Sequence, residues 1–166
     1  MGHKLTENDI KKMQEEIDHR ILVVRKEALE DVKTARAQGD LSENFEYYAA
    51  KKFKNQNESR IRYLEKMIKN AEVISDESSE DEIGVNNTVV IRYDGEDEEE
   101  TVKLVTTVRG DMLLGNVSIE SPLGKALLGK KAGDRVHVDV DSNVSFDVEI
   151  ISFTNTDDST DSIMKY

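Results

Sequence analysis

Residues 10–35 read IKKMQEEIDHRILVVRKEALEDVKTA, and this segment sets the architecture of the N-terminal half. Its apolar side chains recur every three or four residues, a period that places them in one narrow stripe along an α-helix. The stripe consists of Ile10, Met13, Ile17, Ile21, Val24, Ala28, Val32 and Ala35. Because an apolar stripe has to be covered, this helix requires a partner to pack against.

A second apolar stripe follows a short break at residues 38–42. It consists of Phe45, Ala49, Phe53, Ile61, Leu64, Ile68 and Ala71. Asn57 interrupts this stripe, and a polar residue at such a position is typical of one that fixes helix register. Gly39 can adopt the left-handed conformation that ends a helix, and so short a break makes the two helices antiparallel neighbours. Residues 1–74 are therefore predicted to form an antiparallel α-helical coiled-coil hairpin, with arms of roughly 43 Å.

The period changes in the C-terminal half, where short segments are rich in β-branched residues and partly alternate apolar with polar side chains. These segments are residues 88–93, 101–105, 135–140 and 144–150. Asp94 and Gly95 form a hairpin turn signal between the first two. Ser121, Pro122 and Gly129 are typical of the N-cap, the first position and the end of a short helix. The sequence predicts an antiparallel sheet domain with one short helix, so the chain belongs to the α+β class.

Charge divides the chain at an acidic segment, residues 75–82, which we interpret as a solvated linker. Residues 1–74 hold 15 Lys/Arg and 14 Asp/Glu, whereas residues 75–166 hold 8 and 21, and the net charge of the chain is -12. Residues 154–166 are polar and are predicted to form a frayed tail. The predicted sheet domain therefore spans residues 83–153.

Composition excludes several classes of site. The chain has no cysteine, so it has no disulfide, thiol nucleophile or zinc–thiolate site. Its three histidines lack metal-ligand spacing, and the sequence contains neither a glycine-rich phosphate loop nor a nucleophile elbow. No apolar run approaches the roughly 20 residues that a membrane helix needs, and no apolar signal segment is present. We expect a cytoplasmic protein with no membrane partner and no small-molecule substrate.

The connection between the two predicted helices carries two acids, Asp40 and Glu43. They are typical of a capping box, with Asp40 as the N-cap of the second helix and Glu43 three residues later. They also fit a site at which both carboxylates help to hold a divalent metal ion near a phosphate, because Mg²⁺ favours one or two protein carboxylates with water and phosphate oxygens. The two interpretations are compatible, and a metal site of this kind would need further ligands from another macromolecule.

Basic residues gather on the predicted hairpin near this connection. Residues 33–69 hold nine Lys/Arg and five Asp/Glu, although the whole chain is strongly acidic. Such an excess could follow a phosphate backbone, or it could belong to a solvated helix face of mixed charge. Four aromatic residues lie in the same segment and are more typical of packing within the hairpin than of base stacking. They are Phe45, Tyr47, Tyr48 and Phe53.

The connection and its flanks resemble a known signature. The residues ARAQGDLSEN at 35–44, EY at 46–47 and AAK at 49–51 are similar to the motif of the bacterial Gre transcript-cleavage and elongation factors, GreA type. The similarity continues in SPLGKALLGK at 121–130 and in GDRV at 133–136. It therefore covers both predicted domains in the same order.

The resemblance implies that the C-terminal domain is FKBP-like and docks beside the secondary channel of bacterial RNA polymerase, which the hairpin enters. It implies that Asp40 and Glu43 are the catalytic and metal-binding residues, holding Mg²⁺ jointly with the polymerase so that none is bound by the isolated protein. The polymerase would then cleave the 3′ end of backtracked RNA and resume elongation. The protein would be an accessory factor and not itself an enzyme.

The resemblance also implies contact surfaces. Arg36 and Lys51 match basic residues of the family that approach RNA. The excess of Lys and Arg on the predicted hairpin adds Lys52 and Arg60 to the predicted nucleic-acid contacts. The predicted polymerase-docking residues are Ser121, Pro122, Leu123 and Gly124. Three alternatives stay open at this point. They are a related factor that occupies the channel without promoting cleavage, a prolyl isomerase built on the second domain, and a hairpin adaptor or chaperone.

Overall fold

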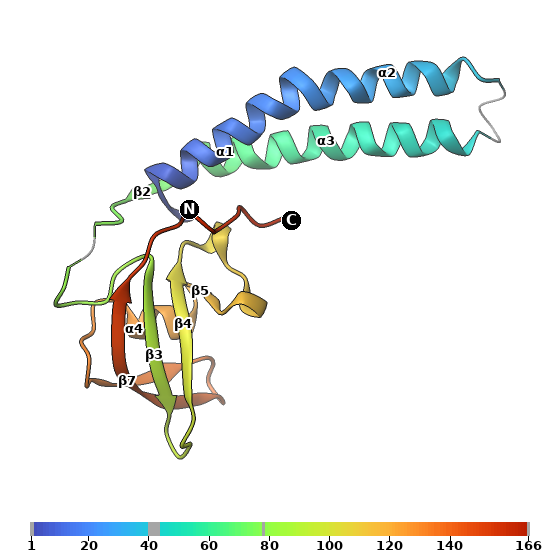
Figure 1. Cartoon of the computed structure of the whole chain (residues 1–166). Helices are drawn as coiled ribbons and strands as arrows, with labels where there is room; N and C mark the ends of the chain where they lie inside the picture. The colour runs from blue at the N-terminus through green and yellow to red at the C-terminus, as the bar shows by residue number, and fades with distance from the viewer. Residues whose placement is uncertain (1, 40–43, 78, 166) are drawn as a thin grey trace. The chain divides into compact units, whose positions relative to one another are not determined.

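The computed structural model describes residues 2–39, 44–77 and 79–165, and the chain divides into two compact units. The first unit contains Asn8–Ala71, and the second contains His3–Glu7 together with the chain from Glu72 onward. Figure 1 shows the first as a pair of long helices and the second as a curled sheet. Among the described residues, no helix has both the length and the apolar character required to cross a membrane.

The first unit is the predicted antiparallel hairpin. Its first arm is one continuous helical run composed of α1 (Glu7–His19), a π-helical turn η1 (Arg20–Val24) and α2 (Arg25–Arg36). Its second arm is α3 (Phe45–Lys69), which lies alongside α2 in Figure 1. Every residue of the first predicted stripe, from Ile10 to Ala35, is buried or half-buried, which confirms that stripe.

The second predicted stripe is wrong in its first half. Phe45, Ala49 and Phe53 are all exposed. The buried and half-buried positions of α3 instead include a series three or four residues apart, in which Asn57 is a member and not an interruption. That series is Tyr47, Ala50, Lys54, Asn57, Ile61, Leu64 and Ile68. The apolar character of Phe45 and Phe53 therefore did not indicate the side of the helix that packs.

Asn57 joins the two arms at the π-helical turn. Its side-chain nitrogen donates to the carbonyl oxygen of Arg20 at 3.3 Å, and its side-chain oxygen accepts from the Arg20 guanidinium at 3.0 Å. The backbone N–H of Arg25 also donates to the Arg20 carbonyl, which is the longer spacing of a π-helix. A polar group inserted at a helix carbonyl is a recognised cause of such a local distortion. These contacts fit the predicted role of Asn57 in helix register.

The second unit is built on a five-stranded sheet in the order β5-β4-β3-β7-β6. Its strands are β3 (Asn87–Tyr93), β4 (Glu99–Val105), β5 (Asn116–Ser118), β6 (Arg135–Asp139) and β7 (Ser145–Asn155). All neighbours are antiparallel except β4 and β5, which are parallel, so the sheet is mixed and not purely antiparallel. Between β5 and β6 lies α4 (Pro122–Leu127), the predicted short helix.

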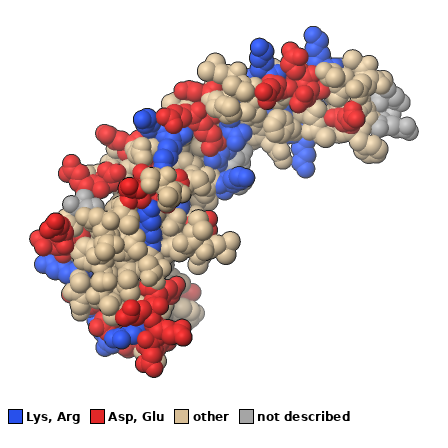
Figure 2. Space-filling model, viewed as in Figure 1, with Lys and Arg blue, Asp and Glu red and all other residues tan. Residues whose placement is uncertain are grey.

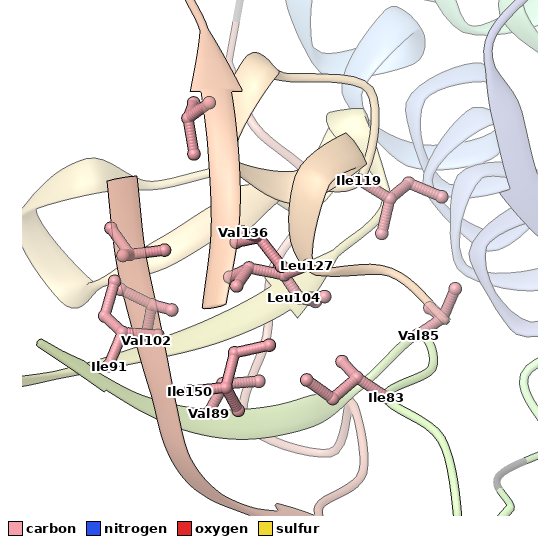
Figure 3. Close-up of a cluster of buried hydrophobic side chains, with 12 residues drawn as sticks. Ile83, Val85, Val89, Ile91, Val102, Leu104, Ile119, Leu127, Val136 and Ile150 are labelled. Carbon is pink, nitrogen blue, oxygen red and sulfur yellow. The ribbon is translucent and has the colours of Figure 1, made fainter. Parts of the chain in front are cut away.

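The core of the second unit lies within the curl of this sheet. Alternate residues of each strand, such as Val89 and Ile91 of β3, point into one apolar cluster that Leu127 of α4 completes. Figure 3 shows these side chains converging from β3, β4, β6, β7 and α4. The period-two pattern of the sequence predicted this inward face, because successive side chains of a strand point to opposite sides.

Short elements outside the predicted strands complete the second unit. Two single 3₁₀ turns, η2 (Thr107–Arg109) and η3 (Met112–Leu114), connect β4 to β5. A separate parallel pair joins β1 (Lys4–Thr6) to β2 (Glu72–Ile74). The predicted boundary at residue 74 therefore differs from the structure, in which both three-residue strands belong to the second unit. Such short strands carry no readable period.

The C-terminal segment differs from the frayed tail that the sequence predicted. Thr154 and Asn155 complete β7. Beyond them, the Asp161 carboxylate lies 2.8 Å from the buried guanidinium of Arg109 and 3.0 Å from the ammonium of Lys103. The backbone N–H of Met164 donates to the carbonyl of Val108 at 2.7 Å. This polar segment is therefore anchored to the domain at Asp161 and Met164, although most of its described residues are exposed.

Candidate functional site at the hairpin connection

The two predicted metal-binding acids, Asp40 and Glu43, lie outside the described residues. The structure describes the chain on both sides of them, up to Gly39 and again from Asn44. Gly39 has a positive φ of 126°, a conformation that glycine adopts without the clash a Cβ would cause. α2 ends at Arg36 and α3 begins at Phe45, so both helix ends that flank the two acids in the sequence are described.

Asn44 caps one helix and ties it to the other. Its side-chain oxygen accepts from the backbone N–H of Tyr47 at 3.0 Å, which makes it the N-cap of α3. Its side-chain nitrogen donates to the carbonyl of Ala35, near the end of α2, at 2.7 Å. The interpretation that made Asp40 the N-cap of this helix is therefore wrong, and capping α3 requires neither acid.

We expect Asn44→Ala to lower the stability of the hairpin by about 2 kcal/mol, because the N-cap and the bond to Ala35 contribute about 1 kcal/mol each. Asn44→Asp is the matched control, since it keeps the cap acceptor and loses only the donor to Ala35. Thermal unfolding followed by helical circular dichroism measures both variants. Equal melting temperatures for wild type and Asn44→Ala would contradict this role.

Arg36 and Tyr47 form a positively charged contact across the hairpin. The Arg36 guanidinium lies 5.6 Å from the centre of the Tyr47 ring and donates to its hydroxyl at 3.5 Å. The hydrogen bond from Arg36, together with the charges of Lys51 and Lys54, lowers the pKa of Tyr47 below its usual value. The basic side chains around Tyr47 therefore favour the ionised form of its hydroxyl.

Three of the four predicted nucleic-acid contacts are on the surface, and one is not. Arg36, Lys51 and Lys52 are exposed. The Arg60 side chain is only 7% exposed and donates to both carboxylate oxygens of Glu16, at 2.8 and 3.2 Å. This burial removes Arg60 from the candidate interface, because its charge serves to join α3 to α1.

Glu16 is the acid at the centre of this contact. Arg20 also donates to it, at 2.7 Å. Burial raises the pKa of Glu16, but the hydrogen bonds from Arg60 and Arg20 outweigh burial and lower it below the usual value. Figure 2 shows Lys and Arg mixed with Asp and Glu along the hairpin, so the excess of basic residues does not form one continuous patch in that view.

The predicted docking segment is well ordered, and its four residues differ in exposure. Ser121 is the N-cap of α4, accepting from the N–H of Gly124 at 3.1 Å. A Cβ on Gly124 would lie 1.9 Å from the carbonyl oxygen of Ser118, so this glycine is required for close packing. Leu123 packs against the core, and only Pro122 is fully on the surface. Pro122 is thus the fully exposed residue of this segment, and its contact with the polymerase stays a prediction.

A prolyl isomerase needs an aromatic-lined pocket, and the described part of the second unit has two aromatic side chains close together in its sheet. Tyr93 and Phe146 pack against each other, with ring centres 5.5 Å apart, and both lie against the core. A cleft of about 390 Å³ beside Tyr93 is lined mainly by charged side chains, among them Arg92, Asp97 and Glu149. This chemistry does not suit an apolar proline ring.

The two units of the chain both match models of the same protein family. The N-terminal family model of the GreA/GreB transcription elongation factors matches residues 3–73, and the C-terminal model matches residues 77–155. The transcription elongation factor GreA of Streptococcus pneumoniae serotype 4 is 41% identical over 155 residues, which cover 93% of this chain and 96% of that protein. GreA of Streptococcus sanguinis is similar to the same extent.

Solved structures include more distant proteins. The GreA factor homolog 1 (Gfh1) of Thermus thermophilus is 24% identical, with a TM-score of 0.44 over 93% of this chain and all of that one. A GreA/GreB factor from Nitrosomonas europaea is 22% identical, with a TM-score of 0.40 over 92% of this chain and 98% of that one. On the family models and the streptococcal relatives together, the chain belongs to the GreA/GreB family of transcription elongation factors.

Proposed function

We propose that this elongation factor inserts its hairpin into the secondary channel of bacterial RNA polymerase and stimulates cleavage of the 3′ end of backtracked RNA. Asp40 and Glu43 would complete a Mg²⁺ site that the polymerase leaves partly unfilled, and the isolated protein would hold no metal. The cleaved RNA would then have its 3′ end back in the polymerase active site. The protein would act as an accessory factor, with the bond-breaking chemistry remaining in the polymerase.

The observation that supports this proposal is that Asn44, and neither acid of the connection, is the N-cap of α3. Asn44 both caps α3 and bonds to Ala35 of α2. Two carboxylates three residues apart in the sequence between α2 and α3 fit the oxygen donors that Mg²⁺ prefers.

The residues of this chain would have separate tasks. Bound Mg²⁺ would supply charge stabilisation to the reacting phosphate and lower the pKa of a bound water. Asp40 would bind the metal, and Glu43 would complete the coordination or orient the water. Arg36 and Lys51, both exposed, would attract the RNA phosphates without reading its sequence. Pro122 would contact the polymerase outside the channel.

A cleavage assay on stalled complexes tests the proposal. RNA polymerase is halted in a backtracked state with 5′-labelled RNA, and the protein is added with Mg²⁺ or with a chelator present. We expect the labelled RNA to shorten rapidly only when the protein and Mg²⁺ are both present. Binding without shortening would contradict the proposal and would identify a channel-occupying factor that regulates the polymerase without promoting cleavage.

A further inference from the structure

Three aromatic side chains at the start of α3 lie outside the packing of the hairpin. Phe45 is 85% exposed, Tyr48 51% and Phe53 49%. Three exposed rings on one segment of α3 form an apolar surface that gains about 1.5–3 kcal/mol for each ring that a partner covers. The register of α3 explains their exposure, because Tyr47, Ala50 and Lys54 occupy the packed side.

Phe45 and Tyr48 share one face of α3 with the basic side chain of Lys52. At 100° per residue, Tyr48 is displaced from Phe45 by about 60° around the helix, and Lys52 by only about 20°. Lys52 is exposed and lies two turns along the same face. Tyr48 is oriented by an edge-to-face contact with Tyr47, with ring centres 5.6 Å apart. Phe45, Tyr48 and Lys52 therefore form an aromatic and basic stripe, which we call the aromatic stripe.

We propose that the aromatic stripe binds single-stranded RNA by stacking Phe45, supported by Tyr48, on an unpaired nucleobase while Lys52 meets the phosphate backbone. Proteins that bind single-stranded nucleic acid without sequence preference combine aromatic rings, which stack on nucleobases, with Lys and Arg side chains, which contact the phosphates. A purely apolar protein surface would leave the Lys52 charge on this face without a partner, whereas the phosphates of a nucleic acid pair with it. The inference rests on the proposed function for the source of that RNA, the extruded 3′ segment of a backtracked transcript.

The aromatic stripe adds a contribution to RNA affinity that depends little on salt, unlike the phosphate contacts. Contacts from lysine and arginine weaken steeply as salt rises, because they depend on the release of counterions. Stacking on a base depends on the ring and much less on salt. The aromatic stripe therefore makes the affinity for an extruded transcript depend on the presence of unpaired bases.

The test measures binding of the full-length protein to stalled polymerase complexes whose RNA ends in a 3′ segment that cannot pair with the template. The segment carries either normal nucleotides or abasic ribose residues, so its phosphates are the same in both. The variants are Phe45→Leu, which keeps an apolar side chain but removes the ring, and Phe45→Trp, which keeps a ring. Phe53→Leu is the matched control, because it removes an exposed ring about 80° away around the helix.

We expect Phe45→Leu to weaken binding to the normal segment about fivefold or more, the equivalent of one stacked base. Phe45→Trp and Phe53→Leu should bind as wild type does, and the abasic segment should abolish the difference between wild type and Phe45→Leu. Equal binding by wild type and Phe45→Leu would overturn the inference. So would an equal loss on complexes without extruded RNA, which would assign Phe45 a contact with the polymerase instead.

Failure of the proposed function is distinguishable from failure of this inference. Binding is read without any cleavage, so the aromatic stripe can be judged even if no RNA is cut. Conversely, if wild type and Phe45→Leu bind alike but both stimulate cleavage at saturating concentration, only the inference fails.

Discussion

Stimulated RNA cleavage should fall to the rate measured without the protein when Asp40→Asn and Glu43→Gln are combined. Both amides keep the size of the carboxyl groups but remove the negative charge that a divalent cation requires. Binding to the polymerase should persist, because Asn44 and the rest of the hairpin are unchanged. Cleavage of stalled complexes, together with competition for polymerase binding, measures the two effects separately.

Glu46→Gln provides the matched control for this double variant. Glu46 is an exposed acid in the first turn of α3, so the substitution makes the same chemical change just outside the predicted metal site. It should leave stimulated cleavage close to that of wild type. If the double variant stimulated cleavage fully, the two acids would have no role in the chemistry, and the hairpin would act by occupancy alone.

Asp161→Asn should destabilise the second unit by about 3 kcal/mol, because it removes the carboxylate that faces a buried guanidinium. The Arg109 side chain has no exposed surface, and the side chain of Asp161 is 4% exposed. Lys103 faces the same carboxylate and would lose it too. Hydrogen exchange of the β3 and β7 amides, read by mass spectrometry, reports on this unit without interference from the hairpin.

Glu149→Gln is the control for this second prediction. It removes a carboxylate that lies 2.7 Å from Arg92, in a pair whose side chains are more than a third exposed. An exposed pair of this kind contributes at most about 1 kcal/mol, so exchange should change little. Wild-type protection of β3 and β7 in Asp161→Asn would mean that the C-terminal segment does not stabilise the domain.

The spacing of apolar side chains along the sequence explains which helices and strands could be predicted. The stripe from Ile10 to Ala35 fixes a helix because residues three and four apart share one face, and no distant contact is needed to see it. The cap at Ser121 and the alternation in β6 and β7 are equally local. The candidate acids were found from their spacing in the connection between the helices, and the resemblance then implied their catalytic role. That role stays a prediction because both acids lie outside the described residues.

Contacts between distant residues explain the predictions that differed. Phe45 and Phe53 have the apolar character of packed residues, yet α3 packs through the side that carries Asn57, whose bonds reach Arg20, 37 positions away. Arg60 has the appearance of a surface base in a charged segment, and only its pairing with Glu16 across the hairpin buries it.

The amino-acid sequence by itself determined the hairpin, the sheet domain and their order, because helix and strand periods are properties of neighbouring residues. Contacts between distant residues set which face of α3 packs, which basic residues stay exposed, and that Asp161 and Met164 anchor the C-terminal segment. Each of these depends on charge or hydrogen-bond partners that meet only after the chain has folded, so polarity and spacing alone do not specify them.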